Sequence, residues 1–220
     1  MREVAMFAGI SVALLDVMGD DLTVVNAARV SMDKHHTEFT LGDRYLIDYL
    51  AEHNHWSPFA HPQVSFRVKA PIFVARQLAK HQVGLSWNEV SRRYVDTSPE
   101  FYLPEMRKRA EHVKQGSLDE VVSGACDIIT DATVAAKRAY DDLLQMGVAP
   151  EVARTVLPQN MMTEWIWTGS LYAFCRVVNL RIDPHAQREA GVVARKIRRF
   201  LINCFPQSTR ALLKTVDKQD

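Results

Sequence analysis

The sequence has little cysteine and no pattern typical of a metal site. Its three cysteines, Cys126, Cys175 and Cys204, lie far apart and form no CxxC pair. An odd, widely spaced set argues against a disulfide framework and against a zinc site. We therefore expect no metal ion, and we interpret each cysteine as a small buried hydrophobic residue.

The sequence also lacks a long apolar run and an excess of charge. No segment is apolar for long enough to cross a bilayer, and no cleavable leader follows Met1. The net charge of +1 gives no general attraction to nucleic acid or to anionic membranes. These absences predict a cytoplasmic protein without a membrane or nucleic-acid partner, in which any basic patch is local.

Length and residue pattern indicate an α+β fold. A chain of 220 residues with 47% hydrophobic content suits one domain over residues 1–220, or one domain with a helical extension. Strands and long helices are expected in a mixed sheet-and-helix arrangement without a βαβ rhythm. The patterns predict strands within 3–17 and 64–68, and helices over 41–53, 70–82, 117–147, 150–157, 161–180 and 183–204, with a short helix within 95–116.

Capping residues fix several of these boundaries. Pro71 suits the first turn of the helix over 70–82, because its missing N–H would have no partner there. Ser117 and Glu120 form a capping-box pattern ahead of the long helix. Asp183 is the expected cap of the last helix.

The segment Lys80–Tyr94 concentrates side chains that bind an anionic nucleotide. Arg76 and Lys80 lie four apart on the predicted helix, where like charges repel unless an anion lies beside them. A bound phosphate would be that anion, and the forks of Arg92 and Arg93 can each grip a phosphate through two N–H groups. A solvated charged loop is the alternative, but such a loop has no need of the interleaved aromatic, hydroxyl and amide residues.

The order of these residues resembles the signature of the flavin-dependent thymidylate synthases, an Arg-His-Arg run followed shortly downstream by Ser. Here the run is Lys80-His81-Gln82, and Ser91 follows with eight residues between. Further blocks resemble that family in the same order: ARVS at 28–31, HWSPFAH at 55–61, FRVKAPIFVARQ at 66–77, RTVLPQN at 154–160 and NLRIDPHAQRE at 179–189.

This resemblance implies the thymidylate synthase-complementing protein fold, a homotetramer, and methylation of dUMP to dTMP at uracil C5. Methylenetetrahydrofolate would donate the carbon, and FAD reduced by NADPH would carry the hydride. The family uses no enzyme thiol as nucleophile, so none of the three cysteines is expected to take that role.

The resemblance also implies which residues form the site. Arg181 is expected to stabilise the N3–O anion of the uracil, and His55 to assist carbon transfer near the flavin and folate. The dUMP-binding set is Gln77, Leu78, Ala79, Lys80, Glu89, Val90, Ser91, Arg92, Arg93, Arg154 and Arg181. The FAD-binding set is Ser31, Ser57, Lys80, His81, Gln82, Asn88, Glu89, Ser170, Leu171, Tyr172, Arg176 and His185.

Two positions depart from the family signature, and two residues have simpler interpretations. Lys80 keeps the charge of an arginine but loses its fork, and Gln82 loses the charge, so the flavin contacts there differ from the family pattern. Outside the resemblance, Arg181 would be a helix-end arginine near carbonyl groups. His55 would be a structural hydrogen-bonding residue in a loop that contains proline.

Two other functions compete with this interpretation. A related flavoenzyme on the same scaffold could hydroxymethylate dUMP or act on another pyrimidine nucleotide, and the mass of the product separates these reactions. A helical nucleic-acid-binding module could use Arg92, Arg93 and the basic cluster at 195–199, and it would show salt-dependent DNA affinity. The net charge of +1 and the scattered family blocks favour the enzyme over that module.

Overall fold

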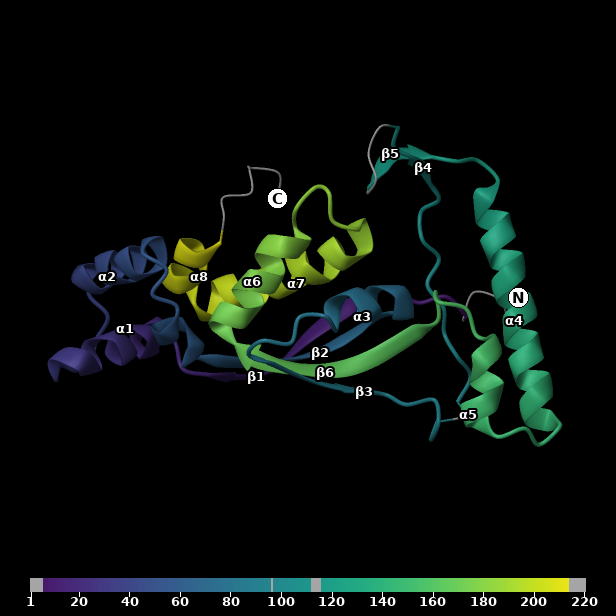
Figure 1. Ribbon diagram of the computed structural model, residues 1–220, viewed down its shortest axis with the longest axis horizontal. Helices are drawn as coiled ribbons and strands as arrows, with labels where there is room; N and C mark the ends of the chain where they lie inside the picture. Colours follow the sequence, from purple (N-terminus) through teal and green to yellow (C-terminus); the bar gives the residue numbers. More distant parts are fainter. Residues whose placement is uncertain (1–5, 96, 112–115, 214–220) are drawn as a thin grey trace.

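The computed structural model describes residues 6–95, 97–111 and 116–213, and it has the predicted α+β fold (Figure 1). Its centre is a four-stranded antiparallel sheet in the order β1-β2-β6-β3. β2 and β6 pair along their whole length and form the middle of the sheet. The strands are β1 (Ser11–Met18), β2 (Gln63–Pro71), β3 (Leu85–Glu89) and β6 (Met162–Ser170).

Helices cover one face of this sheet, because apolar and polar side chains alternate along the strands. Phe66 of β2 and Trp165 and Trp167 of β6 are buried on the covered face. On the other face, Arg67 forms an ion pair with Glu164 across the same two strands, at 2.7 Å. Within the described residues no helix covers this second face (Figure 1).

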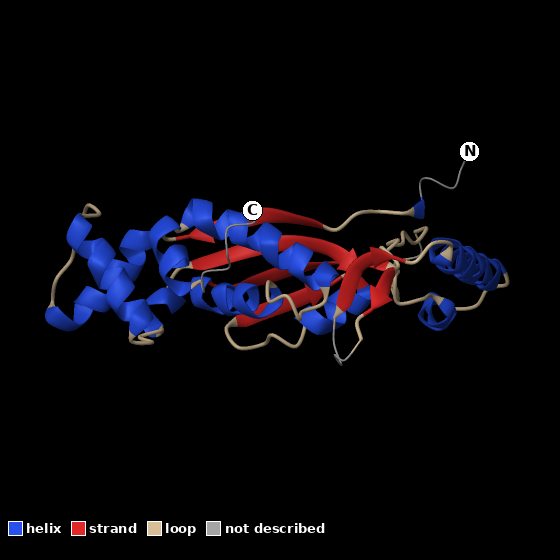
Figure 2. Ribbon diagram, turned by 90° about the horizontal axis from the view of Figure 1, so that it is seen from above, coloured by secondary structure: helices blue, strands red, loops and turns tan. Residues whose placement is uncertain are grey.

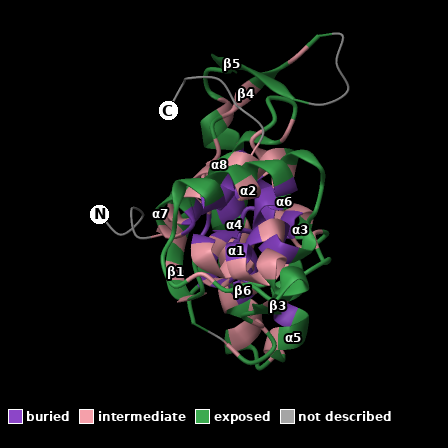
Figure 3. Ribbon diagram, turned by 90° about the vertical axis from the view of Figure 1, so that its left-hand side faces the viewer, coloured by how far each residue is buried: buried purple, intermediate pink, exposed green. Residues whose placement is uncertain are grey.

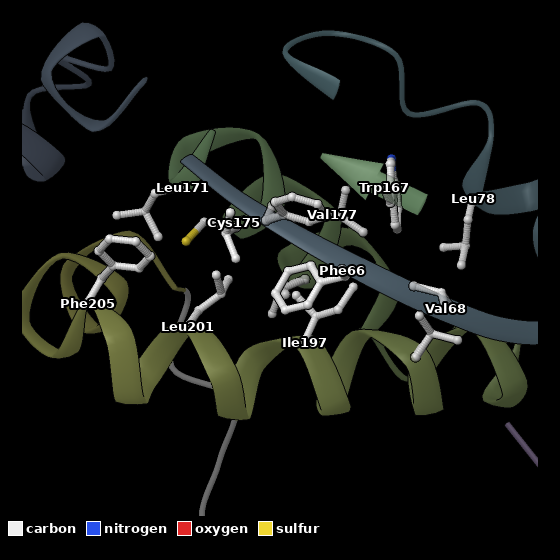
Figure 4. Close-up of a cluster of buried hydrophobic side chains, with 14 of the residues drawn as sticks. Phe66, Val68, Leu78, Trp167, Leu171, Cys175, Val177, Ile197, Leu201 and Phe205 are labelled. Atoms are coloured by element: carbon white, nitrogen blue, oxygen red, sulfur yellow. The ribbon is translucent and has the colours of Figure 1, made fainter. Parts of the chain in front are cut away.

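Three helices form the covering layer: α3 (Ile72–Leu78), α6 (Leu171–Arg181) and α7 (Arg188–Cys204) (Figure 2). The expected apolar stripe of α7 faces the sheet, and its members are buried except for the half-buried Cys204: Ala190, Val193, Ala194, Ile197, Leu201 and Cys204. Figure 4 shows Ile197 of this stripe next to Phe66, whose ring meets Phe174 of α6 edge-on with centroids 5.0 Å apart.

Further elements extend the molecule at both ends of the sheet (Figure 1). One end carries α1 (Asp21–Arg29), α2 (Leu41–Glu52), α8 (Pro206–Leu212) and the 3-10 turns η2 (Val30–Met32) and η3 (Ser57–Ala60). The other carries the hairpin of β4 (Arg107–Arg109) and β5 (Ser117–Val121), with α4 (Ala125–Gln145), α5 (Pro150–Ala153) and η4 (Arg154–Val156).

Burial is concentrated where the helices meet the sheet (Figure 3). Among the described helices, none is long and apolar enough to cross a membrane.

The structure confirms the predicted strand at 64–68 and the helix at 41–53, and it corrects several other predictions. Residues 161–180 were expected to form one helix, but they form the central strand β6 followed by α6. β6 is rich in aromatic and β-branched residues, which favour strands. The neighbouring strands β2 and β3 form hydrogen bonds with its backbone N–H and C=O groups. Ser170 is the N-cap of α6, and its hydroxyl oxygen accepts from the amide of Ala173 at 3.2 Å.

The bounds of three helices were also wrong. Residues 117–121 pair with β4 as strand β5, and the long helix begins at Ala125 after Gly124, which has φ +77°. Helix α3 spans only Ile72–Leu78, with Pro71 as its cap, so Lys80 lies beyond it. The last helix begins at Arg188, not at Asp183.

Other differences concern the ends and connections of the chain. The segment expected to hold one or two strands within 3–17 forms the single strand β1, and residues 1–5 lie outside the described residues. No helix forms in the described part of 95–116. Cys126, expected to be buried, is exposed on α4, whereas Cys175 is buried.

Candidate active site

Arg181 is the last residue of α6. Its side chain is held in place by one residue in the last turn of α3 and one residue just after that helix. Its Nε donates to Nε2 of His81 at 2.9 Å, and its Nη2 donates to the carbonyl oxygen of Gln77 at 3.3 Å. The contact requires an unprotonated Nε2 on His81, so the ring is neutral with its proton on Nδ1. Burial and the positive charges of Arg181 and Arg176 hold the pKa of His81 at about 4.

His81 should therefore titrate with a pKa of about 4, well below the ordinary histidine value of 6.5. The unfolded chain takes up this proton at higher pH than the folded chain does. The free energy of unfolding that the neutral His81 contributes is therefore lost as the pH falls from 6.5 towards 4. NMR of the histidine ring carbons measures this titration, and His81→Asn identifies the signal. A midpoint near the ordinary value would contradict the buried contact with Arg181.

Arg181 lines a cavity of about 980 Å³ between the end of α6, the start of α7 and the β4–β5 hairpin. Two other residues of the predicted sets, Gln77 and His185, line the same cavity. Burial lowers the pKa of Arg181, but its guanidinium remains the natural partner for a ligand anion. The cavity has further cationic walls that the sequence analysis missed: Arg107, Arg188 and Arg195.

A second cavity of about 530 Å³ lies at the β3 edge of the sheet and holds a different part of the predicted dUMP set. The members that line it are Glu89, Val90, Arg92 and Arg154. Arg93 lies near Arg154, because Arg93 pairs with the carboxylate of Glu151 at 3.6 Å and Arg154 donates to the carbonyl oxygen of Glu151 at 3.3 Å. The guanidinium groups of Arg93 and Arg154 can each donate charge-assisted hydrogen bonds to an anionic ligand.

The carboxylate of Glu89 is fixed by two neighbours on the covered face of the sheet. The hydroxyl of Thr163 donates to its Oε1 at 2.6 Å, and the indole N–H of Trp87 donates to its Oε2 at 3.2 Å. Sequence reasoning missed Thr163, because that residue was placed in a helix and its strand pairing was not visible.

Ser91 and Arg92 shape the loop after β3. The Ser91 hydroxyl oxygen accepts from the amide of Arg93 at 3.3 Å, and the guanidinium of Arg92 donates to the carbonyl oxygen of Thr97.

Part of the predicted flavin set comes together at the start of α6. Ser170 caps this helix and Tyr172 lies in its first turn, where the Tyr172 ring is 6.0 Å from that of exposed Trp56, which precedes Ser57. The turn after Gln82 reaches the same place, because a Cβ at Gly84 would stand 3.2 Å from the Cβ of Ala173. Leu171 is fully buried, so its side chain contributes packing rather than a polar contact.

The donors at this place fit a flavin nucleotide. The hydroxyl of Ser57, the amide of Gln82 and the exposed guanidinium of Arg176 can donate to phosphate and ring oxygens, and Trp56 and Tyr172 offer aromatic surface for stacking. His55 is exposed next to Trp56, and its ring lies 6.1 Å from that of Tyr49.

Some predicted residues lie apart from these groups within one chain. Ser31 is in η2 at the α1–α2 end, where its hydroxyl donates to the carbonyl oxygen of Ala28, whereas His185 lies in the loop before α7 (Figure 1). Asn88 points to the opposite face of β3 from Glu89, because side chains alternate along a strand.

The remaining three residues of the dUMP set, Leu78, Ala79 and Lys80, follow one another at the end of α3 and differ in exposure. Leu78 is fully buried, Ala79 is half-buried and Lys80 is exposed.

In the described part of the chain, no cluster of three or more His, Cys, Asp or Glu side chains could hold a metal ion.

The two cavities bring arginine side chains to the ends of α3 and α6 and to the β3 edge of the sheet, and guanidinium groups are suited to bind anions. Comparison with known proteins identifies the family. Residues 13–207 match the family model described as "Thymidylate synthase complementing protein". The chain therefore belongs to the thymidylate synthase complementing protein family.

Similar proteins agree with this membership. The flavin-dependent thymidylate synthase of Thermosipho africanus is 41% identical over 212 residues, which cover 94% of this chain and 92% of the relative. That of Thermus thermophilus is 45% identical over 191 residues, 84% of this chain and 69% of the relative. The crystal structure of the UMP/dUMP methylase PolB from Streptomyces cacaoi, bound with 5-Br dUMP, matches this chain with a TM-score of 0.82 and 32% identity. The matched region covers 93% of this chain and 95% of the PolB chain.

Proposed function

We propose that this protein is a flavin-dependent thymidylate synthase that methylates dUMP to dTMP, in the cytoplasm, with methylenetetrahydrofolate as carbon donor and NADPH as reductant. The observation that carries the proposal is the placement of Arg181. Its guanidinium lines the larger cavity while His81 and Gln77 fix its orientation. Family membership supplies the reaction in which such an arginine has a task.

The task of Arg181 is electrostatic. Uracil C5 becomes nucleophilic when the ring gains negative charge at N3 and its neighbouring oxygen, and a guanidinium stabilises that charge through two charge-assisted hydrogen bonds. One such bond contributes on the order of 1.5–3 kcal/mol. Because His81 and Gln77 hold the side chain before the ligand binds, little ordering is needed during the reaction.

The other residues bind and orient the nucleotide and the flavin. Arg92, Arg93 and Arg154 would hold the phosphate of dUMP, and Glu89 would fix the orientation of the nucleotide by accepting a hydrogen bond. The Ser57, Gln82 and Arg176 group would hold FAD, which supplies the hydride when bound.

No cysteine is placed for nucleophilic attack, which agrees with this chemistry. Cys175 is buried, and burial raises the pKa of its thiol as well as that of Cys204. None of the three cysteines lines either cavity. A thiol kept protonated by burial is a poor nucleophile.

We further propose a homotetramer in which each site takes residues from more than one subunit. Supporting this, the dUMP set is divided between two cavities, with Gln77 and Arg181 in one and Glu89 and Arg154 in the other. Large apolar side chains also stand exposed on α4 and directly after it, with Ile128 73% and Met146 80% exposed, as expected of a helix that packs against another subunit.

Binding of FAD tests the cofactor part of this proposal. The protein should bind FAD, and Arg176→Gln should weaken that binding by about tenfold, since one charged contact to phosphate is lost, or about 1.4 kcal/mol. Isothermal titration calorimetry measures the affinity, and Arg199→Gln on the exposed side of α7 is the matched control. A protein that takes up no FAD would refute the flavin-dependent function.

A second candidate is methylation of UMP as well as dUMP. The structural likeness to a UMP/dUMP methylase, with a TM-score of 0.82, favours it. Parallel assays with UMP and dUMP distinguish the two, since a thymidylate synthase restricted to dUMP would leave UMP unchanged.

A further inference from the structure

The Glu89 carboxylate is placed on the sheet by residues that lie deeper in the molecule. Antiparallel pairing sets Glu89 of β3 opposite Trp165 of β6 and Trp87 opposite Trp167. Thr163 lies two residues before Trp165 and therefore faces the same side of β6 as Trp165 and Trp167. In such a ladder, diagonal neighbours are within reach of long side chains. Thr163 and Glu89 are such diagonal neighbours, and the hydroxyl of Thr163 donates a hydrogen bond to Oε1 of Glu89 at 2.6 Å.

The second hydrogen bond to Glu89 comes from a ring that can hardly move. Trp87 stacks on Trp165 with ring centroids 4.2 Å apart and an interplanar angle of 19°, and it meets Trp167 edge-on at 5.4 Å. Both partners are almost fully buried. This packing fixes the direction of the Trp87 indole N–H, which donates to Oε2 of Glu89 at 3.2 Å.

These two contacts act on a side chain that would otherwise be mobile. Glu89 is exposed at the mouth of the 530 Å³ cavity, and an exposed glutamate samples several rotamers. With each oxygen held by one neutral donor, the carboxylate presents its free lone pairs in a fixed direction at the cavity that Arg92 and Arg154 also line.

We propose that Thr163 and Trp87 are positioning residues for nucleotide recognition, because they orient Glu89 as a hydrogen-bond acceptor. The inference rests on the proposed function, in which Glu89 binds dUMP. A carboxylate can only accept hydrogen bonds, so from this ligand it takes one from a sugar hydroxyl or from the base N–H. It also repels the phosphate, which leaves that group to the arginines and gives the nucleotide a single orientation in the cavity.

Removal of the Thr163 hydroxyl tests the proposal. Thr163→Val keeps the shape of the side chain but removes the donor, and dUMP affinity measured by calorimetry should fall by about tenfold, as expected for a lost hydrogen bond to a charged group. Thr163→Ser, which keeps the hydroxyl, should bind within about threefold of the wild type. Trp87→Phe keeps an aromatic ring without the N–H, and it should show a smaller loss of the same kind.

Thr168→Val is the matched control. Thr168 lies on the same strand, and its hydroxyl is hydrogen-bonded to that of Ser65 at 2.7 Å on the other face of the sheet. Its replacement removes a similar hydrogen bond without touching Glu89, so dUMP affinity should stay unchanged. If Thr168→Val weakened dUMP binding as much as Thr163→Val, the effect would be one of strand stability and the proposal would be wrong.

A double-mutant cycle shows whether Thr163 acts through Glu89. Glu89→Gln should weaken dUMP binding at least as much as Thr163→Val, and the double variant should lose no more than Glu89→Gln alone. Independent losses that add in the double variant would overturn the positioning role. If the wild-type protein itself bound no dUMP, the proposed function would fail. Wild-type binding together with unchanged binding by Thr163→Val would refute the positioning role alone.

Discussion

Replacement of Arg181 by lysine should lower kcat at saturating dUMP by about a hundredfold, or about 2.7 kcal/mol, while dUMP affinity falls by less than about threefold. Lysine keeps the positive charge but cannot make the two-point contact that stabilises charge on the uracil N3 and its neighbouring oxygen. It also cannot keep both contacts with His81 and Gln77 that orient the wild-type side chain. Steady-state kinetics and calorimetry with dUMP separate the two quantities.

The matched control for Arg181 is Arg188→Lys. Arg188 lines the same cavity, but its guanidinium pairs with Glu105 at 3.1 Å and with Asp119 at 3.3 Å. A lysine at this exposed position retains most of that interaction, so kcat should change by less than about twofold. Unchanged turnover by Arg181→Lys, with dUMP binding like that of the wild type, would reject the role given to Arg181.

Two nearly inactive variants should regain activity when they form mixed oligomers. Arg181→Lys damages the larger cavity and Arg154→Ala damages the smaller one. If each site combines one cavity from each of two subunits, random mixing of equal amounts restores roughly a quarter of the sites. The measurement is activity at low dUMP after co-expression of the two chains with different tags and purification on both tags.

The pairing of Arg181→Lys with His81→Ala is the control for this experiment. The His81 side chain contacts Arg181 within the same chain, so no arrangement of mixed subunits yields a site in which both are intact. Activity of the Arg181→Lys and Arg154→Ala mixture that merely equals the average of the two variants would show that each subunit builds its site alone.

The sequence predicts best those elements whose packing follows from local pattern. The alternation in 64–68 and the helical spacing in 41–53 both point to the elements that form, because one face of each is buried against the core. The apolar stripe of α7 is also predicted correctly, although the helix begins at Arg188 and not near Asp183.

The errors arise where distant strands decide the structure. Residues 162–170 become a strand because β2 and β3 flank them, and those partners lie far away in the sequence. Ser117 carries a good capping pattern, yet its segment pairs with β4 instead. Local propensity is a weak signal when backbone partners from elsewhere compete for the same hydrogen bonds.

The candidate site shows the same division. The family motifs point to Arg181 and Glu89, since those residues stand in recognisable blocks. The contact of Arg181 with His81 spans 100 residues of sequence, and that of Glu89 with Thr163 spans 74. No sequence pattern gives such a contact, because it depends on how the end of α6 meets the end of α3 and on the register between β3 and β6.

The central claim is that this chain methylates dUMP, and the mass of the product tests it most directly. The protein is loaded with FAD, the flavin is reduced chemically, and dUMP and methylenetetrahydrofolate are added for a single turnover. Mass spectrometry of the nucleotides should then show dTMP, heavier than dUMP by one CH₂ group. A product heavier by CH₂O, or dUMP recovered unchanged by a folded and flavin-loaded protein, would contradict it.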